Sequence, residues 1–171
     1  MALEVLRGRE YESIERELRA WLQGAKKLVI MGIGCSLRRD DFVGVQIVRG
    51  LRNRVSNKVH LIECETVPES SIEPVTELKP THILIVDAAL LNLPPGSAVL
   101  IEPSRAGGAS ISTHALPLSL LSEYLSHETG AKITLLAVQP KETGFGEGLS
   151  DELDEAHKSI VELLAYVLSD I

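Results

Sequence analysis

Three residues of this sequence, Asp41, Asp87 and His114, stand where an α/β fold usually does its chemistry. Each follows a predicted strand or precedes a predicted helix. Two carboxylates and one imidazole provide the oxygen and nitrogen donors that suit a divalent transition metal ion. The same set could also position and activate a water molecule by general acid–base chemistry. A structural interpretation stays open for each residue, because acids cap helices and turns and a histidine can precede a helix.

The first of these acids follows a stretch that predicts a strand, a tight turn and a helix. The apolar run 28–31 is typical of a buried parallel strand, and two glycines precede the acid pair Asp40 and Asp41. Open α/β sheets place their ligands beyond the carboxyl ends of such strands. Leu37 stands where a dinucleotide fingerprint needs its third glycine, and no Gly-Lys-Ser or Gly-Lys-Thr follows. Nucleotide binding at this turn is therefore disfavoured.

Predicted strands and helices alternate along the whole chain. Hydrophobic periodicity predicts strands at 28–31, 59–63, 82–87, 97–101 and 132–138, and helices at 11–22, 43–51, 72–78, 116–125 and 151–167. This order predicts a three-layer α/β/α sandwich around a mostly parallel sheet of about five strands. Too few residues separate 82–87 from 97–101 for a helical crossover, so we expect that pair to be antiparallel and the sheet to be mixed.

Composition limits the classes of protein to which the chain can belong. Its 171 residues, 44% hydrophobic and 4% aromatic, predict one domain over 1–171 with an aliphatic core, in which 1–25 form an N-terminal helical extension. A net charge of −7 argues against a nucleic-acid surface. No apolar run approaches the roughly 20 residues that span a bilayer, so no membrane insertion is expected. Two cysteines and no signal-peptide pattern favour a reducing cytoplasm.

Four segments, in order, resemble the hydrogenase maturation proteases. The segment 32–44 reads Gly-Ile-Gly-Cys-Ser-Leu-Arg-Arg-Asp-Asp-Phe-Val-Gly, 84–88 reads Leu-Ile-Val-Asp-Ala, 112–118 reads Ser-Thr-His-Ala-Leu-Pro-Leu, and 137–140 reads Ala-Val-Gln-Pro. The likeness is closest to the branch that serves formate-hydrogenlyase-type hydrogenases. It implies a cytoplasmic, monomeric, aspartic-type endopeptidase. Its partner would be the precursor of a [NiFe]-hydrogenase large subunit, whose C-terminal extension it would remove.

The resemblance also implies roles for individual residues. Asp41, Asp87 and His114 match the family's metal ligands, which bind nickel already seated in the substrate. Asp41 and Asp87, with Glu63 after the second predicted strand, would be the catalytic carboxylates. The protease itself would carry no intrinsic cofactor, although zinc or cadmium could occupy the site in vitro. Asp40 matches the preceding acid of the motif and would orient its neighbour.

Two departures from the family pattern concern the cysteines. Cys35 replaces the usual asparagine in the glycine turn. Residues 63–66, Glu-Cys-Glu-Thr, replace a typical Asp-Gly-Gly-Thr, so a positive-φ backbone there would be strained. Cys35 and Cys64 follow neighbouring predicted strands and could pair, although two free thiols are the simpler expectation.

Two alternative functions stay open beside the protease. A small-substrate hydrolase would use the same residues to hold its own zinc. A maturation chaperone would dock on the precursor without cutting it, which the altered 63–66 loop makes worth testing. The glycine-rich loop 144–148, which carries Phe145, could act as a flap over substrate.

Overall fold

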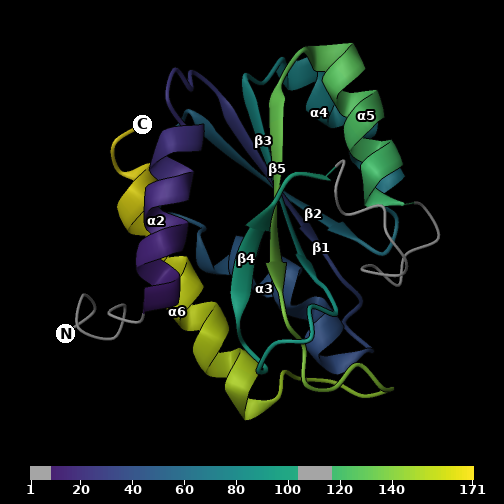
Figure 1. The fold of residues 1–171 in the computed structure, drawn as a ribbon. Helices are drawn as coiled ribbons and strands as arrows, with labels where there is room; N and C mark the ends of the chain where they lie inside the picture. Colours follow the sequence, from purple (N-terminus) through teal and green to yellow (C-terminus); the bar gives the residue numbers. More distant parts are fainter. Residues whose placement is uncertain (1–8, 104–116) are drawn as a thin grey trace.

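One mixed sheet organises the described part of the chain. The structure is a computed structural model that describes residues 9–103 and 117–171 (Figure 1). Within them, five strands lie in the order β2-β1-β3-β5-β4. Their bounds are β1 Leu28–Ile33, β2 Val59–Glu65, β3 His82–Ala88, β4 Ala98–Ile101 and β5 Lys132–Val138. Strand β1 runs parallel to β2 and β3, β3 runs parallel to β5, and β4 is antiparallel to β5.

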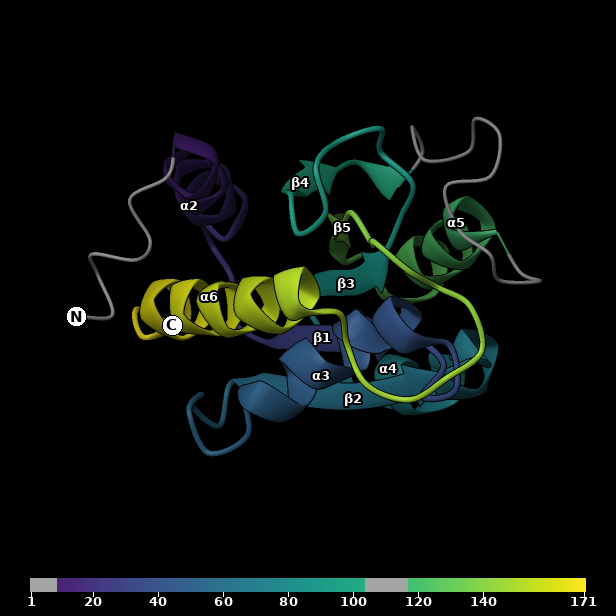
Figure 2. The ribbon, with the colours of Figure 1, turned by 90° about the horizontal axis from the view of Figure 1, so that it is seen from below.

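Helices cover both faces of this sheet, which confirms the predicted three-layer α/β/α architecture. Their bounds are α2 Arg9–Trp21, α3 Val43–Gly50, α4 Ile72–Leu78, α5 Leu118–Thr129 and α6 Asp151–Leu168, with 3₁₀ helices η1 Arg39–Phe42 and η2 Pro68–Ser71. Figures 1 and 2 show α2 and α6 on one side of the sheet and α4 and α5 on the other. None of the described helices is long and apolar enough to cross a membrane.

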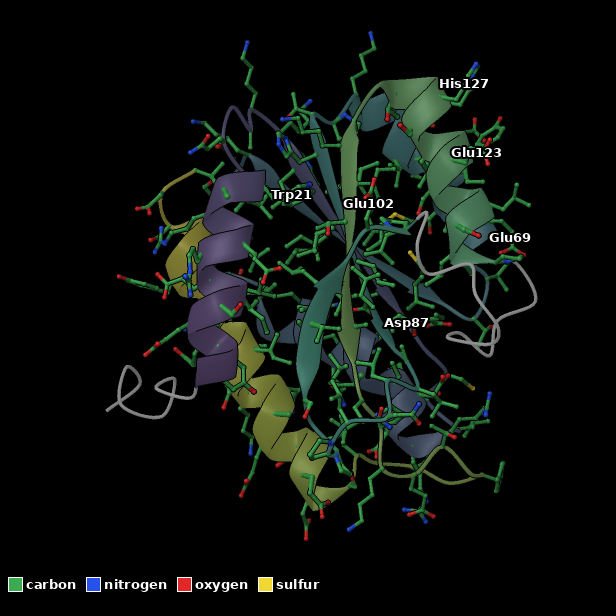
Figure 3. All side chains as sticks on the ribbon, in the orientation of Figure 1. Trp21, Glu69, Asp87, Glu102, Glu123 and His127 are labelled. Atoms are coloured by element: carbon green, nitrogen blue, oxygen red, sulfur yellow. The ribbon has the colours of Figure 1, made fainter. Side chains whose placement is uncertain are left out.

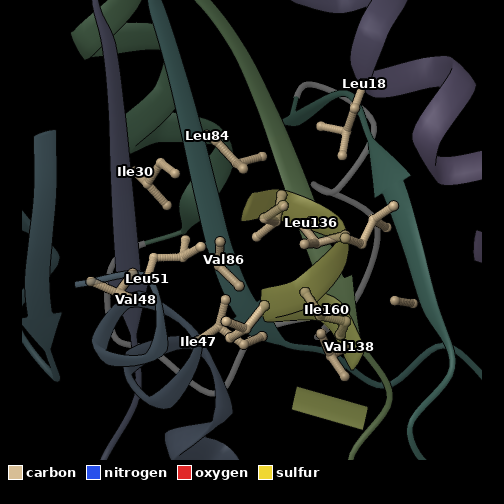
Figure 4. Packing of buried hydrophobic residues seen from close by; sticks show 14 of the residues in the cluster. Leu18, Ile30, Ile47, Val48, Leu51, Leu84, Val86, Leu136, Val138 and Ile160 are labelled. Carbon is tan, nitrogen blue, oxygen red and sulfur yellow. The ribbon is translucent and has the colours of Figure 1, made fainter. Parts of the chain in front are cut away.

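The core divides into two aliphatic clusters because strand side chains alternate between the faces. The larger cluster joins one face of the sheet to α2, α3 and α6; Figure 4 shows its members, including Leu18, Ile30, Ile47, Leu84, Leu136 and Ile160. The smaller cluster joins the other face to α4 and α5. Strand β1 is buried at every residue, as its unbroken apolar run predicted. Each fully buried aliphatic side chain contributes about 1.5–3 kcal/mol.

The N-terminal helix α2 is attached to the start of β3. Its residues Ile14 and Leu18 are buried in the larger cluster. The imidazole of His82 lies 3.0 Å from the carbonyl oxygen of Trp21 and packs edge-on against the indole, with 5.0 Å between ring centroids. Burial lowers the pKa of His82, so the neutral ring is favoured. These contacts give His82 a structural role, the attachment of α2 to the first residue of β3. The extension boundary at 1–25 stays a prediction.

The antiparallel strand has a different neighbour from the one we expected. Strand β4 is antiparallel, as predicted, but it pairs with β5 and not with β3. The reason is that β5 already occupies that edge of β3. Gln139 holds the connection between β3 and β4 in place. Its backbone carbonyl accepts a hydrogen bond from the N–H of Gly96, and its side-chain oxygen accepts one from the N–H of Leu91. The antiparallel direction of β4 thus comes from the short connection between β3 and β4, and its partner comes from the strand order of the sheet.

Candidate active site

A glycine turn brings the first acid pair back against the sheet. Gly34 adopts φ +154°, and a Cβ atom there would lie 2.1 Å from the backbone oxygen of Asp41. A Cβ atom on Gly44 would lie 2.2 Å from the backbone oxygen of Val86 in β3. Only glycine permits either approach. The two glycines therefore let η1 fold onto the end of β1 and let the first turn of α3 pack against β3.

Asp41 is held in place by the backbone of the same turn. Its side chain is 3% exposed, and Oδ2 accepts a hydrogen bond of 3.0 Å from the backbone N–H of Cys35. Because the donor is a backbone group, a cysteine at position 35 supplies it as well as an asparagine would. The departure at Cys35 thus leaves this orientation of Asp41 intact.

The neighbouring Asp40 is an anchor for another loop. It is fully buried, and its Oδ2 accepts from the backbone N–H groups of Lys141 and Glu142, each at 2.9 Å. Ser150 donates its backbone N–H to Oδ1 at 2.7 Å and its hydroxyl to Oδ2 at 2.8 Å. Ser150 directly precedes α6, yet its hydroxyl bonds Asp40 and not the backbone of the helix. Asp40 therefore orients residues 141–150, which its sequence motif did not reveal.

Asp87 lies near the carboxyl end of β3 and is 1% exposed (Figure 3). Alternation along β3 places it on the same face as Ile83 and Ile85, which belong to the cluster under α4 and α5. The thiol of Cys64 lies on that face too. Burial chiefly raises the pKa of Cys64 to about 11, the nearby Asp87 carboxylate raises it further, and a hydrogen bond with Ser71 opposes the rise. Asp87 thus has a buried thiol nearby, and this thiol is hydrogen-bonded to Ser71, a residue that the sequence analysis missed.

The two acids come from neighbouring parallel strands. Strands β1 and β3 are adjacent, and η1, which carries Asp41, packs against β3, which carries Asp87. Both carboxylates therefore stand at the same edge of the sheet, as predicted from strand ends in an open α/β fold. Buried carboxylates are costly unless hydrogen bonds or a cation compensate them. This edge can consequently present oxygen ligands to a metal ion.

Glu63 is not brought to the same face as Asp87. Gly32 of β1 is in register with both Glu63 of β2 and Val86 of β3. Residues in register share a face of the sheet, so Asp87, one residue beyond Val86, points to the opposite face. Glu63 instead forms ion pairs with Arg49 and Arg52 next to α3. The catalytic role predicted for Glu63 has no support from this geometry.

The third predicted ligand, His114, lies outside the described residues. Within 9–103 and 117–171, no three His, Cys, Asp or Glu side chains form a group that could hold a metal ion. Asp41 and Asp87 therefore need a further ligand from outside these ranges or from a bound partner to make a three-ligand set.

The end of β2 contains the backbone strain that its sequence predicted. Glu65 adopts φ +50° at the position where the resembled motif has a glycine. A non-glycine residue in this left-handed region costs about 1–2 kcal/mol. Its carbonyl oxygen nevertheless accepts the N–H of Gly34 at 2.9 Å and so joins the two turns. Cys35 and Cys64 are both free thiols, the simpler of the two expectations.

A groove of about 1010 Å³ lies along α5, away from the acid pair. It is lined by Trp21, Glu102, Glu123 and His127, which Figure 3 labels above Asp87 in the view, and by the first residues of β5. Asp87 is in register with Ala137, five residues after Lys132 in the groove wall. The groove is therefore separate from the edge that carries Asp41 and Asp87.

Comparisons with known proteins agree with this arrangement. A family model described as hydrogenase maturation protease matches residues 45–166. A putative hydrogenase maturation protease of Methanocaldococcus jannaschii is 35% identical over 158 residues, which cover 88% of this chain and 93% of that protein. The hydrogenase 3 maturation protease of Escherichia coli is 28% identical over 137 residues, 80% of this chain and 87% of that protein.

The fold is also that of solved structures. A crystal structure of a [NiFe] hydrogenase maturation protease, HycI, from Thermococcus kodakarensis aligns with a TM-score of 0.84 and 32% identity. The alignment covers 90% of this chain and 99% of the other. The five-stranded mixed sheet with helices on both faces is thus the architecture of that protein as well.

Proposed function

The chain belongs to the hydrogenase maturation protease family, and we propose that it removes the C-terminal extension of a nickel-loaded [NiFe]-hydrogenase large-subunit precursor. The observation that carries this proposal is the pair of buried carboxylates, Asp41 and Asp87, at adjacent strand ends. The nickel belongs to the substrate and is what the site recognises. A precursor without nickel would then lack the group that holds its cleavage site in place.

The chemistry of the residues supports this assignment. Asp41 and Asp87 supply carboxylate oxygens, and His114 would add an imidazole nitrogen, a donor set suited to a divalent transition metal. The hydrogen bond from the Cys35 N–H fixes the orientation of Asp41 before substrate arrives. Burial of both carboxylates strengthens their attraction for a cation, because water does not screen it there. The same carboxylates could accept a proton from the attacking water, which makes the enzyme an aspartic-type peptidase.

Several further properties belong to the same proposal. The enzyme has no resident cofactor, and the only metal at its site is the nickel of the bound precursor. It acts as a monomer on that precursor in the cytoplasm. The large-subunit precursor is its partner, and the acidic net charge of −7 gives no footprint for nucleic acid.

The deciding experiment is cleavage of purified precursor, with and without nickel, followed by intact-mass spectrometry. We expect the wild type to shorten only the nickel-loaded precursor. Asp87→Asn and Asp41→Asn should each slow cleavage at least about 100-fold, since a neutral amide is a poor metal ligand and base. Asp154→Asn, an exposed acid on α6, is the matched control and should cut at the wild-type rate.

Other outcomes of this assay contradict the proposal in distinct ways. Equal cleavage of the nickel-free precursor would refute recognition of the metal. Stoichiometric zinc in the enzyme as purified would favour a zinc hydrolase, and tight binding without cleavage would favour a chaperone. Glu63→Gln, measured in parallel, tests the remaining predicted catalytic residue. Its ion pairs with Arg49 and Arg52 lead us to expect cleavage close to the wild-type rate.

A further inference from the structure

Exposed apolar side chains gather at the edge of the sheet that carries the candidate site. Among the described residues, the exposed large hydrophobic side chains outside helices all lie in loops that follow a parallel strand: Leu37, Val67, Leu90, Leu93 and Phe145. These loops follow β1, β2, β3 and β5, whose carboxyl ends share one edge. Apolar side chains gathered around a site indicate a contact surface for another polypeptide.

Leu37 and Phe145 are brought together by the backbone. The N–H of Gly146 donates to the carbonyl of Leu37 at 2.9 Å, and the N–H of Arg39 donates to the carbonyl of Gly146 at 3.2 Å. Arg38 and Gly146 form a parallel β-bridge. Phe145, next to this bridge, is 87% exposed, and Leu37 is 46% exposed. We call these two side chains, with the bridge beneath them, the apolar ledge.

The ledge is anchored from below by the buried Asp40. This carboxylate accepts hydrogen bonds from the backbone N–H groups of Lys141, Glu142 and Ser150 and from the Ser150 hydroxyl. The backbone N–H of Asp40 also donates to the carbonyl of Glu142 at 3.0 Å. The loop that was predicted to be a flap is therefore bonded to the turn on both sides of Phe145. Figure 1 shows it lying beside the η1–α3 segment.

Phe145 combines an exposed side chain with a backbone that is anchored by hydrogen bonds. The exposed ring of Phe145 contributes nothing to the core, yet the backbone on both sides of it is hydrogen-bonded to the turn that carries Asp40. Rigid aromatic side chains are the usual anchors of protein interfaces, since little conformational entropy is lost on binding. The two arginines next to the ledge have partners within the chain. Arg39 forms an ion pair with Glu142 at 3.5 Å, and the Arg38 Nε donates to the Thr143 carbonyl at 3.2 Å.

From this arrangement we infer that the ledge is a docking anchor for the precursor polypeptide, with Phe145 entering an apolar pocket beside the segment to be cut. The inference rests on the proposed function, because it takes the precursor as the bound polypeptide. Leu37 precedes Asp41 by four residues on the same turn, so the ledge lies next to the candidate site. The ledge and Asp41 belong to the same turn, so the ledge can contact a polypeptide that is bound at Asp41. Asp40 is then a positioning residue: it touches neither nickel nor the cut bond, and it fixes where Phe145 stands.

The test separates docking from chemistry by measuring KM and kcat for cleavage of the nickel-loaded precursor. Phe145→Ala should raise KM about tenfold or more, the effect of losing an interface anchor, and leave kcat unchanged. Leu37→Ala should raise KM less. Tyr124→Ala removes an exposed aromatic from α5 and should leave both constants unchanged. Asp40→Asn should raise KM as Phe145→Ala does and speed hydrogen exchange at the amides of Lys141 and Glu142.

Each outcome decides the proposal. An unchanged KM for Phe145→Ala, with wild-type cleavage intact, overturns the ledge and leaves the proposed function standing. If Asp40→Asn does not fold, Ser150→Ala replaces it, since that change removes only the hydroxyl bond to Asp40. If the wild type does not cut, direct binding to the same precursor is measured: weaker binding by Phe145→Ala supports the ledge although the cleavage proposal fails. No binding by the wild type overturns both.

Discussion

The carboxyl ends of β1 and β2 both contain a residue with positive φ, but the residue type differs. The first uses Gly34 at φ +154°, where a Cβ atom would collide with the backbone of Asp41. The second uses Glu65 at φ +50°, a left-handed conformation without a glycine. The two are joined by the hydrogen bond from the Gly34 N–H to the Glu65 carbonyl. Position 34 therefore admits no side chain, whereas position 65 tolerates one at a cost in free energy.

This difference shows that the fold requires a particular residue, glycine, at position 34 but not at position 65. At the β1 turn the backbone of Asp41 itself approaches Gly34 closely, so any added atom displaces Asp41. At the β2 turn the only demand is a dihedral angle, and the penalty of about 1–2 kcal/mol is small beside the burial of the strands. The end of β2 also contains a buried thiol, Cys64, near Asp87. Three changes test this contrast.

Gly34→Ala should have the largest effect. A Cβ atom 2.1 Å from the Asp41 oxygen forces the turn to move, so we expect a loss of about 2–4 kcal/mol in the free energy of unfolding, measured in urea. Gly130→Ala is the matched control. Gly130 has φ +70° with nothing within 4 Å of its Cβ position, so it isolates the dihedral cost of about 1 kcal/mol. Equal losses for the two variants would show that the close approach to Asp41 is not limiting.

Cys64 should make stability depend on alkaline pH. Its pKa rises from 9.0 in the unfolded reference to about 11, so folded and unfolded chains bind this proton equally below pH 9. Between those values the unfolded thiol ionises while the folded one stays neutral, and stability falls. By pH 11 the loss should reach about 2–3 kcal/mol relative to Cys64→Ala, from urea unfolding at each pH. Cys35→Ala is the control, and parallel curves for wild type and Cys64→Ala would contradict the raised pKa.

Glu65→Gly should have the smallest effect, and in the opposite direction. Glycine adopts φ +50° without steric penalty, so the free energy of unfolding should rise by up to about 1 kcal/mol, with part of the gain offset by the entropy of the unfolded chain. Glu65→Ala keeps the unfavourable dihedral and removes only the carboxylate. A gain in the alanine variant as large as that in the glycine variant would mean that charge, and not backbone strain, limits this turn.

Much of the fold could be predicted because local patterns reflect burial directly. The apolar run of β1 and the predicted strand at 132–138 both appear as strands, the latter with the same bounds. The partner of β4 could not be predicted, since a short loop fixes its direction but not which strand occupies the edge of β3. Ser150 stands directly before α6, a position at which a serine hydroxyl commonly caps the helix. A carboxylate 110 residues away in sequence, Asp40, uses this hydroxyl instead.

The candidate site likewise has one part that the sequence predicts and one part that it does not. Residue types and strand ends were sufficient to place Asp41 and Asp87 at one edge, because parallel strands all end there. They could not tell that Glu63 points to the other face, since that depends on the register that aligns Glu63 with Gly32 and Val86. A shift of one residue in register exchanges the two faces of a strand, and no local pattern in a partly buried strand fixes it.

The sequence by itself thus determined the family, the layered architecture and the two acids at the edge of the sheet. These follow from glycine spacing, hydrophobic period and motif order, all of which are local properties of the chain. The tertiary structure decided what the neighbouring groups do: Asp40 anchors the loop of Phe145, Cys64 lies near Asp87, and Glu63 pairs with two arginines. These roles arise from contacts between distant segments, which only the packed fold brings within hydrogen-bonding distance.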